Sequence, residues 1–223
     1  MLYHTLVRKF VANMPMAFQR WYHSASYYRH FRLPETPLVS ICVSAYQRPT
    51  ELKGVLLSLA AQTYKNLEVI VVHDGPAEWL QECNVTADPR IKILNSEIRQ
   101  NDFGQSNYET AVRLAQGTYI GLTNDDNYHV PTYVETLLRA IYLHDAQFAY
   151  CNLLHNYFEY IPLSTAPIVG RIDATGWIAH HSIVKTTPWR YKGGRVDDGK
   201  WVYDIIKKAN KTVKVPSVLA VHN

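Results

Sequence analysis

The chain has 223 residues, of which 47% are hydrophobic and 19% are charged. This length and composition allow a buried core for one or two domains and exclude wholesale disorder. The formal net charge of +4 at pH 7 is compatible with binding to phosphate, nucleic acid or a membrane, so its location matters.

Residues 1–36 differ in composition from the rest of the chain. They hold eight aromatic residues, five basic residues and a single acid, Glu35, so they account for the whole charge excess. Pro34 and Pro37 mark the end of this arm. Two interpretations stay open: a helix packed on the body of the protein, or an interfacial helix that docks on an anionic membrane or acceptor.

The cellular location is predicted from features that the chain lacks. No window approaches the roughly 18 consecutive apolar residues of a membrane span. The three cysteines, Cys42, Cys83 and Cys151, are isolated in the sequence, which argues against a zinc ribbon or a disulfide scaffold. We expect a cytoplasmic protein, with peripheral contact to the cytoplasmic face of a membrane through the arm.

From residue 37 onward, short aliphatic runs alternate with segments of helical periodicity. The runs predict strands at residues 38–44, 67–73, 90–94, 118–122, 147–153, 178–184 and 213–221. The periodic segments predict helices at residues 50–62, with Thr50 as N-cap, and at 77–84, 106–116, 131–144 and 198–209. Strand–helix alternation predicts an α/β fold with a mostly parallel, Rossmann-like central sheet flanked by helices.

The alternation weakens after residue 151. We therefore divide the body into a nucleotide-sugar-binding α/β part at 37–151 and a smaller, irregular part at 152–223 that belongs to the same globule. Ligands of open parallel sheets bind at the carboxyl ends of strands. The loops to search are those at residues 44–49, 73–75, 124–127 and 195–198. Neither a dinucleotide-binding glycine motif nor a P-loop is present.

Four segments in order resemble the family 2 inverting glycosyltransferases of the GT-A fold: VSICVSAYQRP, LLSLAAQTYKNLEVIVVHDG, AVRLAQGTYIGLTNDDN and VDDGKWV. The resemblance covers residues 37–201. It implies a GT-A fold, a nucleotide-sugar donor that is usually UDP-linked, and a glycan or lipid-linked glycan as acceptor. The second segment is the most specific of the four.

The resemblance also implies nucleotide contacts. Asp74 matches the acid that accepts a hydrogen bond from the base, and the loop of Ser44, Ala45, Tyr46 and Arg48 matches the surroundings of base and ribose. Tyr46 would stack and Arg48 would reach phosphate. From the residues alone, Asp74-Gly75 is also compatible with an ordinary turn.

The adjacent acids Asp125 and Asp126 predict a site for a hard divalent cation, Mn²⁺ or Mg²⁺, which stabilises a departing diphosphate. The alternative is a solvated turn that caps the following helix. The family's D-x-D motif would place an acid at Thr123, where this chain has none. The resemblance gives ribose and metal contacts to Asp125 and the main metal contact to Asp126, and His222 is a further candidate ligand.

Asp197 and Asp198 match the catalytic acid pair of the family, and the register favours Asp198 as the base. Inversion needs one base to take the proton of the acceptor hydroxyl; the alternative is a charged helix N-terminus. Trp177, His181 and Trp201 are acceptor-site candidates, with burial in the core as the alternative for both tryptophans. Tyr108-Glu109 replaces the family's Arg-Asn, so no donor-sugar contact is inferred there.

Two other functions stay open at this point. A sugar-phosphate nucleotidyltransferase would share the sheet and the nucleotide, but its glycine-rich N-terminal signature is missing after residue 44. A nonenzymatic module that binds nucleotide or nucleic acid would fit the basic balance. Since the body at 37–223 is neutral and its basic residues form no recognition pattern, we expect no nucleic-acid partner.

Overall fold

The computed structural model describes residues 28–84, 87–190 and 197–223. Within them, the strands are β1 (Val39–Ala45), β2 (Leu67–His73), β3 (Ile91–Asn95), β4 (Tyr119–Asn124), β5 (Tyr128–His129), β6 (Phe148–His155), β7 (Pro162–Leu163), β8 (Trp177–His180) and β9 (Thr212–His222). The helices are α3 (Pro49–Ala60), α4 (Gln105–Leu114), α5 (Tyr133–His144), α6 (His181–Lys185) and α7 (Asp197–Lys208), with 3₁₀ turns η1 (Glu78–Cys83) and η2 (Asn156–Phe158).

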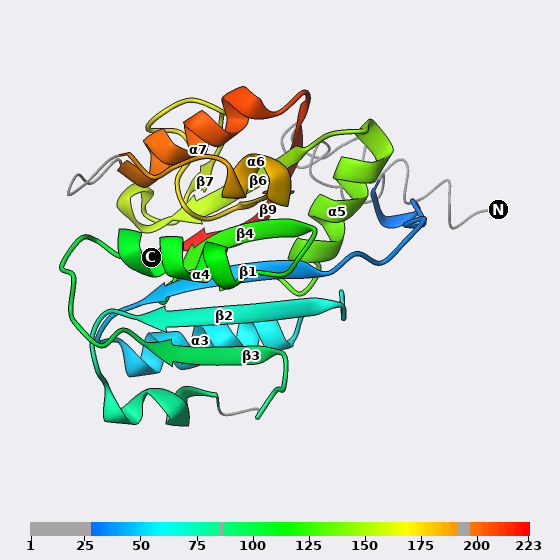
Figure 1. Ribbon diagram of the computed structural model, residues 1–223. Coiled ribbons are helices and arrows are strands. Elements are labelled where there is room, and N and C mark those ends of the chain that lie inside the picture. Colours follow the sequence, from blue (N-terminus) through cyan, green and yellow to red (C-terminus); the bar gives the residue numbers. More distant parts are fainter. Residues whose placement is uncertain (1–27, 85–86, 191–196) are drawn as a thin grey trace.

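The strands form one mixed sheet in the order β3-β2-β1-β4-β8-β6-β9-β5, with β7 paired to β6 (Figure 1). β1 is parallel to β2 and β4, and β6 is parallel to β9. β8 lies between β4 and β6 and is antiparallel to both, so β4 and β6 run in the same direction. The carboxyl ends of β1, β2, β4, β6 and β9 therefore lie along the same edge of the sheet.

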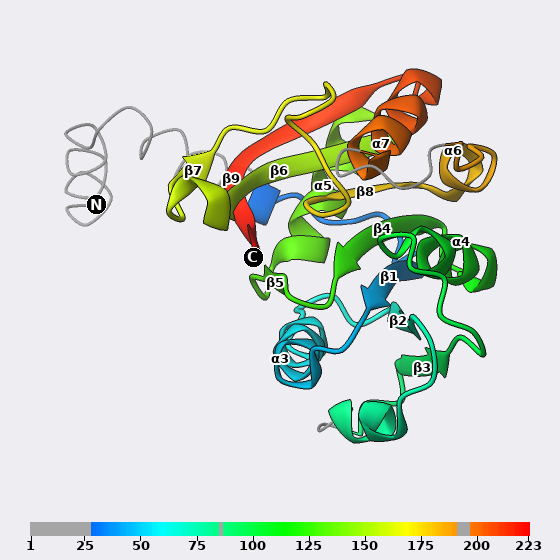
Figure 2. The same cartoon turned by 90° about the vertical axis from the view of Figure 1, so that its left-hand side faces the viewer.

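Helices cover both faces of the sheet, with α3 and α5 on one side and α4, α6 and α7 on the other (Figure 2). The alternation of side chains along β1 shows the two cores: Ile41 and Val43 pack with α3 and α5, and Cys42 packs with α4. All seven residues of β2 are buried, which explains why its sequence is a continuous apolar run. The predicted mostly parallel α/β sheet is confirmed.

Two local predictions were wrong. Helix α3 begins at Pro49, so Arg48 and not Thr50 is its N-cap, because proline is favoured at the first helical position. The strand expected at 178–184 stops at His180, and α6 begins at His181. The His180 ring accepts a hydrogen bond from the Ser182 N–H (3.3 Å), and this cap starts a helix where β-branched residues had predicted a strand.

The end of the N-terminal arm packs on α5. The Arg139 guanidinium donates to the carbonyl groups of Tyr28 (3.3 Å) and Arg29 (2.7 Å), and the Tyr28 side chain is buried. Residues 1–27, and with them most of the predicted arm, lie outside the described residues. Among the described residues, no helix has the length and hydropathy that crossing a membrane requires.

Candidate active site

The structure brings three of the four predicted loops together at the carboxyl edge of the sheet, and residues 195–196 of the fourth lie outside the described residues. Ala45, His73, Asn124, His155 and His222 are the last residues of β1, β2, β4, β6 and β9. The segments at 46–48, 74–75 and 125–127 follow three of these strands directly. Such an edge is where open α/β sheets bind their ligands.

Arg48 joins the two adjacent acids of the β4–β5 loop. Its Nη1 lies 3.1 Å from Asp125 Oδ1 and 2.5 Å from Asp126 Oδ2. The other oxygen of Asp125 accepts a hydrogen bond from the Tyr46 N–H (2.7 Å). The guanidinium is half exposed, while both carboxylates are largely buried. The acids are therefore held by an arginine side chain that can move into solvent.

Both acids hold their protons more tightly than exposed carboxylates do. Burial raises the pKa of Asp125 to about 6, although the Tyr46 N–H and the charge of Arg48 oppose the rise. Burial likewise raises the pKa of Asp126. Asp126 Oδ1 is buried and has no hydrogen-bond partner among the described residues. An oxygen in this state, beside a second carboxylate, fits the ligand set of a hard divalent cation.

Asp74 is buried at the end of β2 and holds a neighbouring loop. Its Oδ1 accepts a hydrogen bond from the Gln100 N–H (2.7 Å), and its Oδ2 accepts one from the Asn101 N–H (3.2 Å). Each carboxylate oxygen has a further lone pair. The carboxylate therefore has a structural function and retains capacity to accept another hydrogen bond.

The aromatic ring of Tyr46 is in contact with two other side chains. The His73 ring is stacked at a centroid distance of 6.0 Å, and the Arg99 guanidinium carbon lies 4.2 Å from the Tyr46 centroid. The sequence did not single out Arg99. In the described conformation, the Arg99 guanidinium occupies a face of the Tyr46 ring, which was predicted to stack on a base.

The two first residues of the predicted nucleotide loop are buried. Ser44 Oγ accepts a hydrogen bond from Asn107 Nδ2 (3.1 Å), and it lies so close to Gly104 that a Cβ there would be 2.2 Å from it. Ala45 is 1% exposed, and its carbonyl accepts from the Asp74 N–H (2.9 Å). Both buried residues thus support the start of the loop from within the protein.

The two acids at the start of α7 differ in their partners. Asp197 is buried and pairs with Lys200, with 3.0 Å between Oδ1 and Nζ. Asp198 accepts hydrogen bonds from the Ala174 N–H (3.2 Å) and the Gly199 N–H (2.7 Å). Burial, followed by the charge of Asp173, raises the pKa of Asp198 to about 6. A carboxylate with this pKa is mostly ionised at pH 7 and suited to proton transfer.

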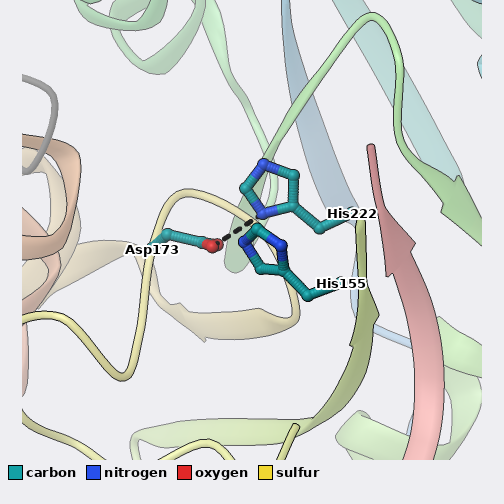
Figure 3. Close-up of side chains that lie close together, drawn as sticks. All are labelled: His155, Asp173 and His222. Carbon is teal, nitrogen blue, oxygen red and sulfur yellow. Dashed lines mark hydrogen bonds and ion pairs between the residues drawn. The ribbon is translucent and has the colours of Figure 1, made fainter. Parts of the chain in front are cut away.

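His222 lies in a cluster with Asp173 and His155 (Figure 3). Its Nδ1 is 2.8 Å from Asp173 Oδ2, and the His155 ring is in contact at a centroid distance of 4.2 Å. Burial alone would lower the pKa of His222, but the hydrogen bond and charge of Asp173, with the charges of Asp126 and Asp198, raise it. His222 therefore lies within range of the charges of Asp126, Asp173 and Asp198.

The three acceptor candidates lie away from the acids or inside the core. Trp177 and Trp201 are 0% and 3% exposed, and their indole N–H groups donate to the carbonyls of Asp173 (2.9 Å) and Thr187 (3.0 Å). These are core positions, the alternative left open for both residues. His181 N–H donates to the Thr118 carbonyl just before β4, so this histidine lies at the opposite edge of the sheet. The acceptor contact of His181 stays a prediction, at a distance from Asp198 that a variant can test.

Asp173 and His155 are site residues that the sequence analysis missed. Asp173 lies in the loop before β8, where no motif surrounds it, and His155 lies two residues beyond the strand predicted at 147–153. The parallel pairing of β6 with β9 places His155 opposite His222, and the loop before β8 brings Asp173 to His222. The one available signal was that each histidine ends or follows an aliphatic run.

Comparisons with known proteins show the family of this chain. The profile of the family described as Glycosyl transferase family 2 matches residues 40–205. The UDP-Glc:alpha-D-GlcNAc-diphosphoundecaprenol beta-1,3-glucosyltransferase WfaP of Escherichia coli is 28% identical over 116 residues, covering 52% of this chain and 45% of WfaP. The chain spans 31%, 45% and 42% of the length of the first curated relatives that it matches.

Two solved structures show the same fold. TarS of S. aureus in complex with UDP-GlcNAc has a TM-score of 0.70 and 14% identity, with 82% of this chain and 58% of that chain covered. The mannosyltransferase PcManGT of Pyrobaculum calidifontis, in complex with GDP-Man and Mn²⁺, has a TM-score of 0.66 and 14% identity, with 92% and 64% covered. The predicted GT-A fold is confirmed.

Proposed function

We propose that this chain, which belongs to glycosyl transferase family 2, transfers a sugar from a nucleotide-sugar to a hydroxyl group of a glycan or lipid-linked acceptor, with inversion at the anomeric carbon. Two observations at the carboxyl edge of the sheet carry the proposal: Asp125 and Asp126 share the Arg48 guanidinium, and Asp126 and Asp198 both act on the His222 ring at the end of β9. A UDP-linked donor and a lipid-linked acceptor are supported by the name of WfaP, and a UDP-sugar also by the TarS complex.

Asp198 is the proposed base. Its carboxylate takes the proton of the acceptor hydroxyl while the hydroxyl oxygen forms a bond to the anomeric carbon. The bond from that carbon to the diphosphate oxygen breaks, and the diphosphate leaves with the electron pair. Asp197 is less suited to this step because it is buried against Lys200, whereas Asp198 has a pKa of about 6.

Asp125, Asp126 and His222 are the proposed ligands of a divalent cation, Mn²⁺ or Mg²⁺. When bound, such a cation stabilises the negative charge that develops on the departing diphosphate. The unpartnered Asp126 Oδ1 supports this assignment. Arg48 holds the same two carboxylates, and we propose that it turns to the phosphates when the donor and cation bind.

The base and ribose of the donor would lie along the loop after β1. We propose that Asp74 accepts a hydrogen bond from the base with its remaining lone pairs, while its present bonds keep residues 100–101 in place. Tyr46 would stack on the base once the Arg99 side chain moves off its ring. Ser44 and Ala45 would contribute the shape of the loop.

The donor and the cation can be identified by thermal shift. UDP, UDP-Glc, UDP-GlcNAc and GDP-Man are compared with and without Mn²⁺, because a ligand that binds the folded state raises the melting temperature. We expect the largest shift from one UDP-sugar together with Mn²⁺. Asp126→Ala should lose the Mn²⁺-dependent part of the shift in melting temperature. The control variant Asp145→Asn should keep it, because this carboxylate is exposed beyond α5.

Turnover and stereochemistry test the chemical step. UDP release in the presence of a lipid-linked GlcNAc diphosphate acceptor should fall at least 100-fold in Asp198→Asn, the usual scale for the loss of a general base. The coupling constant of the new anomeric proton, measured by NMR, should show the configuration opposite to that of the donor. Full turnover in Asp198→Asn or Asp126→Ala would contradict the proposal.

The arm at 1–36 is the proposed membrane contact, because it carries the entire net charge of the chain together with eight aromatic residues. Binding to vesicles that contain phosphatidylglycerol should weaken when residues 1–27 are removed. Unchanged vesicle binding would contradict the contact.

A further inference from the structure

Asp173 uses both oxygens of its carboxylate to join two segments of the chain. Its Oδ2 lies 2.8 Å from Nδ1 of His222, and its Oδ1 accepts a hydrogen bond from the Thr175 N–H (2.9 Å). The carboxylate is 22% exposed and the imidazole 17% exposed. The contact is thus largely screened from water, where a charge-assisted hydrogen bond is stronger than on the surface.

The backbone of Asp173 is fixed to the core. Its carbonyl accepts a hydrogen bond from Trp177 Nε1 (2.9 Å). Trp177 is fully buried and stacks on Phe148 at a centroid distance of 5.3 Å. Because main chain and side chain are both held, the carboxylate presents Oδ2 to His222 from a defined position.

We propose that Asp173 is a positioning residue that fixes the His222 imidazole with Nδ1 as the hydrogen-bond donor, so that Nε2 keeps a lone pair for the divalent cation. This inference rests on the proposed function, which places His222 in the cation site. A neutral imidazole carries one proton, and the partner of one nitrogen decides which nitrogen is free. Histidines that bind metals commonly donate their other N–H to a carboxylate in this way.

The end of β9 is also tied to the acidic loop after β4, in which Asp125 and Asp126 lie. The Asn223 N–H donates to Asn127 Oδ1 (3.3 Å), and Asn223 Nδ2 donates to the Asp126 carbonyl (2.7 Å). The charges of Asp126 and Asp198 act on the His222 ring. His222 is therefore held by Asp173 and lies within range of the charges of Asp126 and Asp198.

His155 does not suit the same task, although it lies in the same cluster. One nitrogen of each imidazole and one oxygen of Asp173 lie within 4.8 Å of one another. However, Nδ1 of His155 accepts a hydrogen bond from the Tyr157 N–H (3.2 Å). In the neutral ring, the proton then resides on Nε2, which leaves no lone pair for a cation. The His155 ring instead limits the rotation of His222 by packing against it.

A double-mutant cycle on Mn²⁺ affinity tests the inference. Mn²⁺ binding is measured by calorimetry in the presence of UDP for the wild type, Asp173→Asn, His222→Ala and the double variant. We expect Asp173→Asn to bind Mn²⁺ 10- to 100-fold more weakly, the usual effect of losing such a partner. The double variant should bind as weakly as His222→Ala alone, because Asp173 acts through His222. Asp145→Asn is the matched control and should bind as the wild type.

Nitrogen NMR of the imidazole gives a second measurement. Its main result comes from the wild type, so it does not depend on the folding of a variant. In metal-free wild type at high pH, where the neutral ring dominates, the His222 signals should show the tautomer protonated at Nδ1. Asp173→Ala should convert them to a mixture of tautomers.

The outcomes separate the inference from the proposed function. If the wild type with UDP does not bind Mn²⁺, the proposed cation site itself is wrong, and the inference fails with it. Two outcomes would overturn only the inference. In the first, the wild type binds Mn²⁺ and Asp173→Asn binds it equally well. In the second, the loss of Mn²⁺ affinity in Asp173→Asn adds to the loss in His222→Ala. A wild-type His222 protonated at Nε2 would overturn it as well.

Discussion

His155 and His222 are paired in register at the ends of the parallel strands β6 and β9, and their ring centroids are 4.2 Å apart. The pair extends the carboxyl edge of the sheet from the strands at residues 39–124 into the C-terminal part of the chain. Asp126 before β5, Asp173 before β8 and Asp198 in the first turn of α7 all act on the His222 ring at this edge. One continuous edge therefore serves both halves of the proposed reaction.

Asp198→Asn should stabilise the fold at neutral pH. The pKa of this carboxyl is about 6 in the folded protein and about 3.9 in an unfolded chain. The folded state therefore binds more protons between these values, and ionisation costs stability above them. We expect the free energy of unfolding in urea to rise by about 1–3 kcal/mol at pH 7.5 and to be unchanged near pH 3.5. A variant less stable than the wild type at pH 7.5 would contradict the assigned pKa.

The reaction should slow in mild acid. A base must be ionised to accept a proton, and kcat/KM reports the pKa of the free enzyme's base. With Asp198 at about 6, kcat/KM should fall about tenfold per pH unit below pH 6, and more steeply if Asp125 at about 6 also has to be ionised. Initial rates from pH 4.5 to 8 check this, and a flat profile between pH 5 and 7 would rule out Asp198 as base.

Arg48→Gln should have opposite effects on two ligands. Removing the guanidinium frees Asp125 and Asp126, so Mn²⁺ alone should bind several-fold more tightly. UDP should bind more weakly, because Arg48 is the proposed phosphate contact. Calorimetry with each ligand separately shows the split. Arg113→Gln, on the exposed face of α4, is the control, and a loss of Mn²⁺ affinity in Arg48→Gln would disprove the competition.

His181→Ala should leave catalysis intact. The residue lies at the edge of the sheet opposite to Asp198, where its N–H bonds to the Thr118 carbonyl. We expect kcat and the acceptor KM to stay within about twofold of the wild type, since exposed changes far from a site have little effect. A large rise in the acceptor KM would show that the acceptor reaches this edge after all.

Trp201→Ala should reduce the stability of the fold, so any loss of acceptor affinity should come together with a loss of stability. The indole is buried, stacks on Trp189 at 4.5 Å and bonds to the Thr187 carbonyl. Loss of a buried tryptophan costs about 3–5 kcal/mol. Thermal and urea unfolding measure the loss, and Trp201→Phe should restore most of it. A fully stable Trp201→Ala variant would contradict the core assignment.

Local sequence determined most of the fold and the first half of the site. Aliphatic runs such as residues 67–73 predict strands that are buried on both faces, and β2 has those bounds. Polar residues that directly follow such runs, Asp74 and Asp125 among them, reach the ligand edge because parallel strands all end there. The predictions failed where a short-range cap outweighed strand propensity, as at His180.

The pairing of residues distant in the chain was decided only by the tertiary structure. Asp173 carries no motif and His155 lies beyond its predicted strand, yet both meet His222 because β9 inserts parallel to β6. The neighbours of each carboxyl likewise distinguish Asp198, whose pKa is raised by burial and the charge of Asp173, from Asp197, which pairs with Lys200. The physical reason is that periodicity reports the contacts of each segment with water. It carries no information on which other segment will exclude that water.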